Sequence, residues 1–342
     1  MMTTRMQRLN PDGWPALALD IGGTWCRAAV VGEDGTLLAR AKSRTFPERS
    51  GPEIVEDCRS LIAKVAAEVG IGITDVGVSV TGPVNPQSGV IYSPPNAQGG
   101  LAGLPLRTEL SRRLDGAQVL VVKDTNAAAL AEQQFGVARG VRDFVYLTIS
   151  TGIGGAAVIQ DRLILGVDGC AGEIGHVSVD PNGPVCGCGR RGCLESIASG
   201  PALARRYSAA RGAGAIDNAS ASASASGNLE GVDVSRAANE GDAVALEILD
   251  SARAAIASAA VDIANLYNPA LIVIGGSVAR ANPEWLTSAG DAVDRLALSP
   301  TRETTQVVAS GLDDDAGLLG AALILQSGAA QTAHGTRIGG EN

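Results

Sequence analysis

The densest group of chemically capable side chains lies in the segment EIGHVSVDPNGPVCGCGRRGCLE, residues 173–195. Its possible metal ligands and its two terminal acids are Glu173, His176, Cys186, Cys188, Cys193 and Glu195. Three cysteines and one histidine complete a tetrahedral Zn²⁺ site with no open position, so we predict a structural zinc ion here. Unlinked thiols or a redox pair are the alternatives, although Cys186 and Cys188 are too close in sequence to form an easy disulfide.

Two glycine-rich motifs indicate phosphate chemistry. ALALDIGG (residues 16–23) leads into TWCRAAVV, and FVYLTISTGIGGAAVI (residues 144–159) repeats the plan of strand, glycine turn and strand. Glycine lets backbone N–H groups approach phosphate oxygens, threonine adds a hydroxyl, and Asp20 can hold Mg²⁺ or its water ligands. The candidate residues are Asp20, Gly22, Gly23, Thr24, Thr151, Gly152, Gly154 and Gly155. Each motif alone is also typical of a plain hairpin turn, and the second copy favours two phosphate-binding hairpins.

The stretch KDTN, residues 123–126, offers a catalytic carboxylate. Asp124 lies between an expected buried strand and an expected helix, where a carboxylate can be held rigidly and accept the proton of a reacting hydroxyl. The alternative is a helix N-cap, a role for which Asn126 competes. Lys123 places an ammonium group beside this carboxylate, and it either enters the pocket or points away to pair with a surface acid.

The elements that must position these residues follow from hydrophobic periodicity. Besides the two hairpins, we expect strands in DVGVSVTGPV and AQVLVVKD, helices in residues 51–70, 126–136 and 235–268, and a last helix in DDDAGLLGAALIL. ALIVIGGSVA reads as a strand that enters a helix through Gly275 and Gly276, which would admit the adenosine end of a nucleotide.

The repeated hairpin predicts a duplicated α/β architecture with a cleft between the halves. We place an N-terminal α/β domain at residues 15–122, joined by a returning helix at about 313–327, and a C-terminal α/β domain with the zinc site at 123–312. Small, polar, low-complexity composition predicts disorder in three segments, residues 1–14, 218–228 and 328–342.

The composition of the 342-residue chain narrows the class of protein. With 45% hydrophobic residues the chain can bury a large core. A net charge of −9 and a pI near 4.9 argue against general affinity for nucleic acid or anionic membranes, since both need a basic face. No run of about 18 apolar residues and no signal-peptide core are present, so we expect a cytoplasmic protein. In that reducing compartment, clustered cysteines bind metal more often than they form disulfides.

The chain resembles the ROK family (repressor, open reading frame, kinase) of sugar kinases and sugar-responsive regulators in six ordered motifs. They are DIGGT at 20–24, KDTNAAALAE at 123–132, STGIGG at 150–155, E-x-G-H at 173–176, C-x-C-G-x-x-G-C-x-E at 186–195 and VIGGS at 273–277. The resemblance implies the actin/hexokinase-like (ribonuclease H-like) fold. It also implies transfer of phosphate from ATP to the 6-hydroxyl of a hexose, glucose or a close analogue such as an amino sugar, with Mg²⁺ and structural Zn²⁺ as metals.

The resemblance further implies roles for single residues. Asp124 is similar to the catalytic base, Glu173, His176 and Glu195 to sugar ligands, and Asn96 in YSPPNAQGGLAGLPL to the sugar-binding asparagine. One carboxylate can accept hydrogen bonds from two vicinal sugar hydroxyls, and His176 would use one ring nitrogen for metal and the other for a hydroxyl. Surface acids on a zinc loop are the commoner alternative. Because the phosphate hairpins lie in other segments, we expect the sugar ligands to act separately from them.

Several alternatives stay open. Lys123 stands where glucokinase-like members usually carry asparagine, which leaves the identity of the sugar open. An N-acylmannosamine kinase is the second candidate, because these motifs do not distinguish it from a glucokinase. A sugar-sensing regulator is disfavoured, because only 19 residues precede Asp20 and a helix-turn-helix module needs more. Polyphosphate is an alternative donor, because phosphate loops recognise phosphates more surely than adenine. We expect a hexose and ATP as partners, no nucleic acid or membrane, and a homodimer or higher homo-oligomer.

Overall fold

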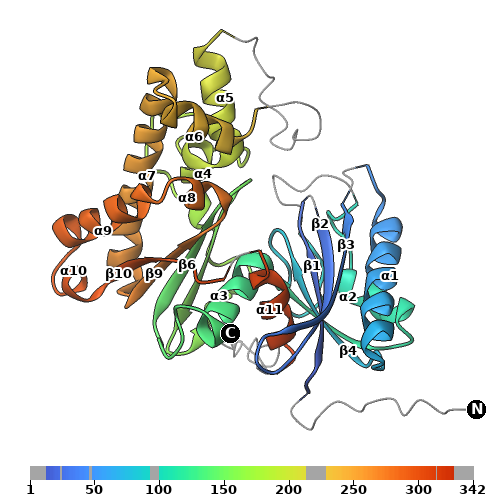
Figure 1. Ribbon diagram of the computed structural model, residues 1–342. Helices are drawn as coiled ribbons and strands as arrows, with labels where there is room; N and C mark the ends of the chain where they lie inside the picture. The colour runs from blue at the N-terminus through green and yellow to red at the C-terminus, as the bar shows by residue number, and fades with distance from the viewer. Residues whose placement is uncertain are drawn as a thin grey trace, which may run out of the picture. The chain divides into compact units, whose positions relative to one another are not determined.

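The computed structural model describes residues 13–23, 25–45, 48–92, 100–212, 229–312 and 314–326. Contacts within the chain define two compact units (Figure 1). Unit 1 comprises Met1–Ala131, Leu165–Ala171 and Asp314–Asn342, and unit 2 comprises Glu132–Ile164 and Gly172–Asp313. Where independently folding domains would begin and end stays a prediction.

Unit 1 contains a five-stranded sheet in the order β3-β2-β1-β4-β5. Its strands are β1 (Ala16–Ile21), β2 (Trp25–Val31), β3 (Leu37–Arg44), β4 (Asp75–Val80) and β5 (Gln118–Lys123). The strands β1 and β2 form the predicted antiparallel hairpin, which we call hairpin one. Because β1, β4 and β5 run parallel, their carboxyl ends meet at one edge of the sheet.

Helices cover both faces of this sheet (Figure 1). They are α1 (Gly51–Val69) and α2 (Leu106–Arg113) on one face and α11 (Ala316–Leu323) on the other, while α3 (Asp124–Phe135) packs against α11. Apolar side chains of α1 share a core with one face of β1, whereas α11 packs on the other face. Gly77 and Gly320 permit close packing here, because an added Cβ would lie 1.7 Å from the Ala321 carbonyl oxygen and 1.8 Å from the Ala127 carbonyl oxygen, respectively.

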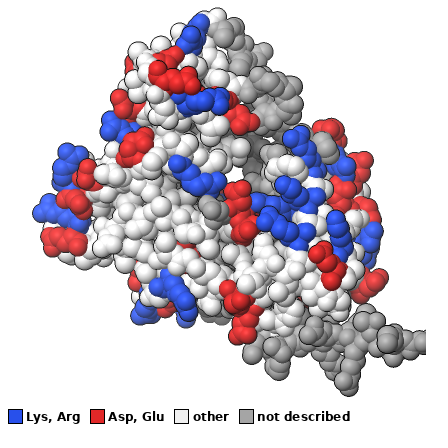
Figure 2. Space-filling view, viewed as in Figure 1, with Lys and Arg blue, Asp and Glu red and all other residues white. Residues whose placement is uncertain are grey.

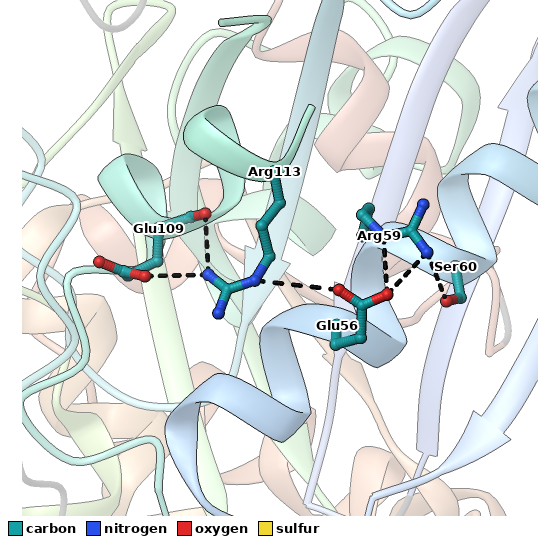
Figure 3. A network of polar contacts seen from close by, with 5 residues as sticks. All are labelled: Glu56, Arg59, Ser60, Glu109 and Arg113. Atoms are coloured by element: carbon teal, nitrogen blue, oxygen red, sulfur yellow. Dashed lines mark hydrogen bonds and ion pairs between the residues drawn. The ribbon is translucent and has the colours of Figure 1, made fainter. Parts of the chain in front are cut away.

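Ion pairs join α1 to α2 on the outside of unit 1 (Figure 3). The Arg113 guanidinium lies 2.9 Å from the Glu109 carboxylate and 3.9 Å from that of Glu56, which also pairs with Arg59 at 2.6 Å. These side chains are 23–50% exposed and reach solvent, so each pair is worth only about 0–1 kcal/mol. The charges of Arg59 and Arg113 on this surface are therefore neutralised by glutamates.

Unit 2 repeats the plan of unit 1 with the order β10-β9-β6-β7-β8. Its strands are β6 (Phe144–Ile149), β7 (Ile153–Ile159), β8 (Arg162–Leu163), β9 (Leu271–Gly275) and β10 (Gln306–Ala309). The strands β6 and β7 form hairpin two, and β6 runs parallel to β9 as β1 does to β4. The shared order and directions of the two sheets confirm the predicted duplication.

The helical part of unit 2 packs around the longest helix, α7. Its helices are η1 (Ile174–His176, a 3₁₀ turn), α4 (Leu194–Ala198), α5 (Gly200–Ala210), α6 (Gly231–Asn239), α7 (Ala243–Tyr267), α8 (Ser277–Ala281), α9 (Glu284–Leu296) and α10 (Thr301–Thr304). The expectation of one continuous helix over 235–268 was wrong. Gly241 has a φ of 92°, which ends the first helix, and the Asp242 carboxylate then caps α7 by accepting from the Val244 N–H at 2.9 Å.

Three segments for which the sequence predicts disorder lie almost wholly outside the described residues. Only Gly13 and Trp14 of these segments are described, and Trp14 is buried. None of the described helices combines the length and the apolar composition that a membrane crossing requires.

Candidate active site and metal centre

The carboxyl edge of the unit 1 sheet gathers several predicted site residues. Ile21 pairs with Val80, and Val80 pairs with Lys123, so the residues that follow each of these strands lie at the same edge. Gly22 of hairpin one and Asp124 are two of these residues. In open parallel α/β sheets this edge is where ligands bind.

Gly23 leaves open space at the tip of hairpin one. A Cβ added to Gly23 would meet no atom within 4 Å, and one added to Gly22 would meet only the Trp25 carbonyl oxygen, at 3.3 Å. Internal packing therefore does not require glycine at Gly23, which is consistent with the close approach of a ligand to the backbone. Thr24 lies outside the described residues.

Asp20 is held by two partners that the sequence analysis did not anticipate. Its Oδ2 accepts from the Arg27 guanidinium at 2.8 and 3.1 Å, and its Oδ1 accepts from the Ser79 hydroxyl at 2.8 Å. Burial raises the pKa of this carboxyl group, while the positive charge of Arg27 and the Ser79 hydrogen bond oppose the rise. Both oxygens are engaged and the residue is 4% exposed, and its role toward Mg²⁺ or the water ligands of Mg²⁺ stays a prediction.

Asp124 opens α3 directly after β5, and it is partly exposed. Its Oδ1 accepts from the Thr125 N–H at 2.7 Å, so the carboxylate also takes up an N-terminal amide of its helix. Its catalytic role stays a prediction. Asn126, the rival cap, is instead buried in the first turn, and no residue that the structure describes donates a hydrogen bond to its Oδ1.

Lys123 is 3% exposed, which overturns the interpretation that it pairs with an acid at the surface. It occupies the face of β5 that also carries Val119 and Val121. Burial of a cation is costly, so a lysine in such a position is normally paired or hydrogen-bonded.

The four predicted metal ligands come together in unit 2. One ligand atom from each of His176, Cys186, Cys188 and Cys193 lies within 4.8 Å of every other. The Nδ1 of His176 is 3.6 Å from the Cys186 Sγ, and the Cys188 Sγ is 3.6 Å from the Cys193 Sγ. Tetrahedral zinc, with bonds of about 2.3 Å to sulfur and about 2.0–2.1 Å to nitrogen, separates neighbouring ligands by about 3.5–3.8 Å. These residues therefore fit a Cys₃His zinc site.

Tight turns wrap the chain around this site. The Cys186 N–H donates to the Arg190 carbonyl at 2.7 Å, and Val185 bridges Arg191 in an antiparallel pair. Gly192 has a φ of 65°, and a Cβ there would lie 1.5 Å from the Asp180 carbonyl oxygen. Burial is the main cause that raises the pKa of the Cys193 thiol to about 12, so a bound cation is needed to keep it as thiolate at neutral pH.

The three predicted sugar ligands surround this metal site. Glu173 precedes the 3₁₀ turn that ends at His176, and Glu195 lies in the first turn of α4, two residues after Cys193. Because Nδ1 of His176 faces the cysteine cluster, Nε2 is the ring nitrogen that would meet a hydroxyl. Their roles toward a sugar stay predictions.

Glu195 also touches hairpin two, contrary to the expectation that the sugar ligands act separately from the phosphate hairpins. Its Oε2 accepts from the Ile153 N–H at 2.9 Å. A Cβ added to Gly152 would lie 2.8 Å from the same oxygen. The segment of residues 173–195, which we call the metal loop, therefore contacts the turn that was predicted to bind phosphate.

The other glycines of hairpin two and of the nucleotide motif serve close packing. A Cβ at Gly155 would lie 2.5 Å from the Ile174 Cδ1, and one at Gly276, whose φ is 97°, would lie 2.3 Å from the Ile149 carbonyl oxygen. Next to Gly276, the hydroxyls of Ser150 and Ser277 are 2.9 Å apart, so the start of α8 lies against the turn. Of the remaining candidates, Thr151 lies in the same turn, Gly154 is the second residue of β7, and Gly275 is the last residue of β9.

A sequence model of the group described as "ROK family" matches residues 16–327. The chain belongs to the ROK family. Membership explains the Cys₃His cluster, which fits the zinc motif of ROK proteins, and the two mixed five-stranded sheets of the actin/hexokinase-like fold.

ROK sugar kinases are similar to this protein over nearly its whole length. It is 35% identical to a protein named glucokinase from Thermotoga maritima, over 91% of this chain and 96% of that one. It is 35% identical to a protein named N-acetylmannosamine kinase from Escherichia coli, over 91% and 98% of the two chains. A crystal structure of a ROK family glucokinase from Streptomyces griseus in complex with glucose and AMPPNP superposes with a TM-score of 0.73 at 32% identity, covering 90% and 97%.

This ROK protein is therefore a sugar kinase whose hexose is not fixed by these similarities. Asn96 lies outside the described residues, so its predicted sugar contact has no structural description. Sequence reasoning missed Arg27 and Ser79 as partners of Asp20. The only signal was the pairing of the strands. Arg27 on β2 and Ser79 on β4 are the residues directly opposite Asp20 on the two neighbouring strands.

Proposed function

We propose that this ROK kinase transfers the terminal phosphoryl group of ATP to the 6-hydroxyl of a hexose, glucose or a close analogue such as an amino sugar. The observation that carries the proposal is the position of Asp124, a partly exposed carboxylate at the sheet edge to which hairpin one also belongs. Phosphoryl transfer to an alcohol depends on positioning, charge stabilisation and a carboxylate that takes the hydroxyl proton.

Each group would have a separate task. Asp124 accepts the proton of the attacking hydroxyl, and the backbone N–H groups of the two hairpins hold the donor phosphates. Glu173, Glu195 and Nε2 of His176 orient the sugar by accepting from or donating to its hydroxyls. A zinc ion on the cysteine cluster would keep these three residues in place and would take no part in the transfer.

A panel of hexoses with ATP, followed by ADP release, tests the proposal. We expect turnover with glucose or an amino sugar and none with the 6-deoxy analogue, which lacks the accepting hydroxyl. Asp124→Asn should lower kcat by about 10²–10⁴ and keep nucleotide binding, because it keeps the shape and removes the proton acceptor. Asp115→Asn is the matched control, since Asp115 is exposed and its φ of 52° suits asparagine equally.

N-acylmannosamine kinase activity is the second candidate. It is supported by the 35% identity to the Escherichia coli protein named N-acetylmannosamine kinase. The highest kcat/KM for N-acetylmannosamine in the same panel would replace the first proposal by this one. Sugar binding without ADP release for any sugar would instead indicate a non-enzymatic sensor. Near-normal turnover in a folded Asp124→Asn variant would show that Asp124 is not the catalytic base and serves only as a helix cap.

A further inference from the structure

One carboxylate of unit 2 is hidden from solvent and has no task in the proposed transfer. Figure 2 shows Asp and Glu side chains spread over the surfaces of both units. Glu132, in the last turn of α3, is instead 0% exposed. Burial of a carboxylate is costly unless its oxygens accept hydrogen bonds, so the donors around Glu132 show what its charge stabilises.

Four uncharged donors converge on Glu132. Its Oε1 accepts from the Ser310 hydroxyl at 2.5 Å and from the N–H groups of Gly311 and Leu312 at 3.0 and 3.1 Å. Its Oε2 accepts from the Val137 N–H at 2.9 Å. Successive backbone N–H groups can form a concavity that binds anions, and here the protein fills such a concavity with its own carboxylate. We call residues 310–312 the clamped loop.

The clamped loop lies at the edge of the unit 2 sheet where the nucleotide motif also begins. It directly follows β10, which runs parallel to β9 with Ala309 opposite Ile274 (Figure 1). The Ser310 N–H continues this pairing, because it donates to the Ile274 carbonyl at 2.9 Å. The carboxyl ends of parallel strands form the ligand-binding edge of an open α/β sheet. The clamped loop is therefore a neighbour of Gly275, the last residue of β9.

Ser310 packs directly on this nucleotide motif. A Cβ added to Gly275 would lie 2.9 Å from the Ser310 Cβ, so the serine fills the space over the glycine. Gly311 is exposed, whereas the carboxylate that holds its N–H is buried. The inner side of the clamped loop thus faces Glu132, and its outer side reaches solvent next to the glycines that were predicted to admit the adenosine end of a nucleotide.

We propose that Glu132 is a positioning residue for the nucleotide, whose carboxylate fixes the clamped loop in the shape that the adenosine end of ATP contacts. The inference rests on the proposed use of ATP as the donor. Because Glu132 is fully buried, it touches neither substrate and acts only through residues 310–312. Without this acceptor, three inward-pointing donors would be left unpaired, and the loop would change its shape to turn them toward water.

A purely structural role would have different consequences. If Glu132 only stabilised β10, the loss of another buried hydrogen bond on this strand would have the same effects. Thr305, directly before the amino end of β10, makes such a bond, because its hydroxyl donates to the Pro269 carbonyl at 2.7 Å and the residue is 5% exposed. Thr305→Val keeps the shape and removes the donor, so it is the matched control.

Kinetics of Glu132→Gln give the first test. The variant keeps the size of the side chain, but its amide nitrogen donates and must face either the Val137 N–H or the N–H groups of the clamped loop. We expect KM for ATP to rise about tenfold, with kcat and KM for the sugar changed by less than about threefold. Glu240→Gln, the same substitution at an exposed position of unit 2, should change none of these constants.

Calorimetry with ADP and with inorganic pyrophosphate separates the adenosine end from the phosphates. Glu132→Gln should weaken ADP binding about tenfold and leave pyrophosphate binding within about twofold of the parent protein. Thr305→Val should lower the urea midpoint, as Glu132→Gln does, without weakening ADP binding. If Glu132→Gln does not fold, Ser310→Ala, which removes one of the four donors, should show the same selective loss with a smaller size.

Equal weakening of ADP and pyrophosphate, unchanged ADP binding in both Glu132→Gln and Ser310→Ala, or an equal loss in Thr305→Val would overturn the inference. A loss confined to kcat would overturn it too, and so would a parent protein that phosphorylates a sugar but does not bind ADP. If the parent protein binds ADP and phosphorylates no sugar with ATP, the proposed function fails, and the calorimetry still decides the inference about Glu132.

Discussion

The two glycine hairpins look alike in sequence but are supported differently. Hairpin one has open space at Gly23 and carries its own buried carboxylate, Asp20, held by an arginine. Hairpin two is covered by the metal loop, since Ile174 fills the place of a Cβ at Gly155 and Glu195 accepts from the Ile153 N–H. The same local motif therefore has a glycine with open surroundings in one unit and, at Gly155, a glycine required by packing in the other.

Different contacts hold the two hairpins in place. Hairpin two depends on residues that the proposed zinc ion orders, whereas hairpin one depends on the pairing of Asp20 with Arg27 and Ser79. Disturbing one support should leave the other hairpin largely intact.

Removal of the metal should have the largest effect. Structural zinc contributes about 10–16 kcal/mol in small zinc peptides, so chelation or Cys193→Ser should unfold the metal loop and destabilise unit 2. Elemental analysis should give about one zinc per chain. Hydrogen exchange should accelerate at residues 151–155 and change little at residues 20–23. Active protein with less than about a tenth of an equivalent of zinc would contradict the prediction.

Loss of the arginine should destabilise unit 1 in a pH-dependent way. Arg27→Met leaves Asp20 buried without its cation, at a cost of about 2–3 kcal/mol at neutral pH, moderated because Arg27 is partly exposed. Burial already raises the pKa of Asp20 and Arg27 lowers it, so the variant carries a higher pKa still. A carboxyl group whose pKa is raised by folding stabilises the folded state at pH values below the pKa that it has in the unfolded chain. This stabilisation is lost as the pH rises through the pKa that it has in the folded protein.

The stability deficit of Arg27→Met should therefore shrink as the pH falls and Asp20 becomes protonated. Urea unfolding across acidic to neutral pH measures this trend. The double variant Asp20→Asn/Arg27→Met should lose the added pH dependence. A deficit that stays constant with pH would show that Arg27 acts through packing alone.

Substitution of Glu195 should affect both substrates. Glu195→Gln replaces an acceptor by a group that also donates, and a lost hydrogen bond to a charged group costs about 1.5–3 kcal/mol, or roughly ten- to over a hundredfold in kcat/KM for the sugar. Because the same side chain holds hairpin two, KM for ATP should rise as well. Kinetics with the best sugar and its 3-deoxy analogue measure the sugar part. Unchanged ATP kinetics would show that the bond to Ile153 is dispensable.

Substitution of one glycine in each hairpin by alanine should have the smallest effect on stability and should compare the two hairpins most directly. Gly155→Ala forces a Cβ against Ile174 and should destabilise the protein by about 1–3 kcal/mol. Gly23→Ala meets no atom within 4 Å, so urea unfolding should change by less than about 0.5 kcal/mol while KM for ATP rises. Equal stability losses at both positions would remove the distinction between the hairpins.

Much of this protein follows from local sequence pattern. The two hairpins, the α1 helix and the Cys₃His cluster were predicted, because each depends on residues close together in the chain. Turn chemistry and strand alternation act over a few residues, so the pattern alone specifies them. The sequence also contains local signals for the break between α6 and α7, namely Gly241 and Asp242. They were overlooked because the helical periodicity continues on both sides of them.

Contacts between distant segments were decided only by the tertiary structure. Ser79 reaches Asp20 across 59 positions and Glu195 reaches Ile153 across 42. The burial of Lys123 likewise depends on which strands are neighbours and in which register. Register and helix approach are set by the packing of whole faces against each other, and no short stretch of sequence contains both partners of such a contact.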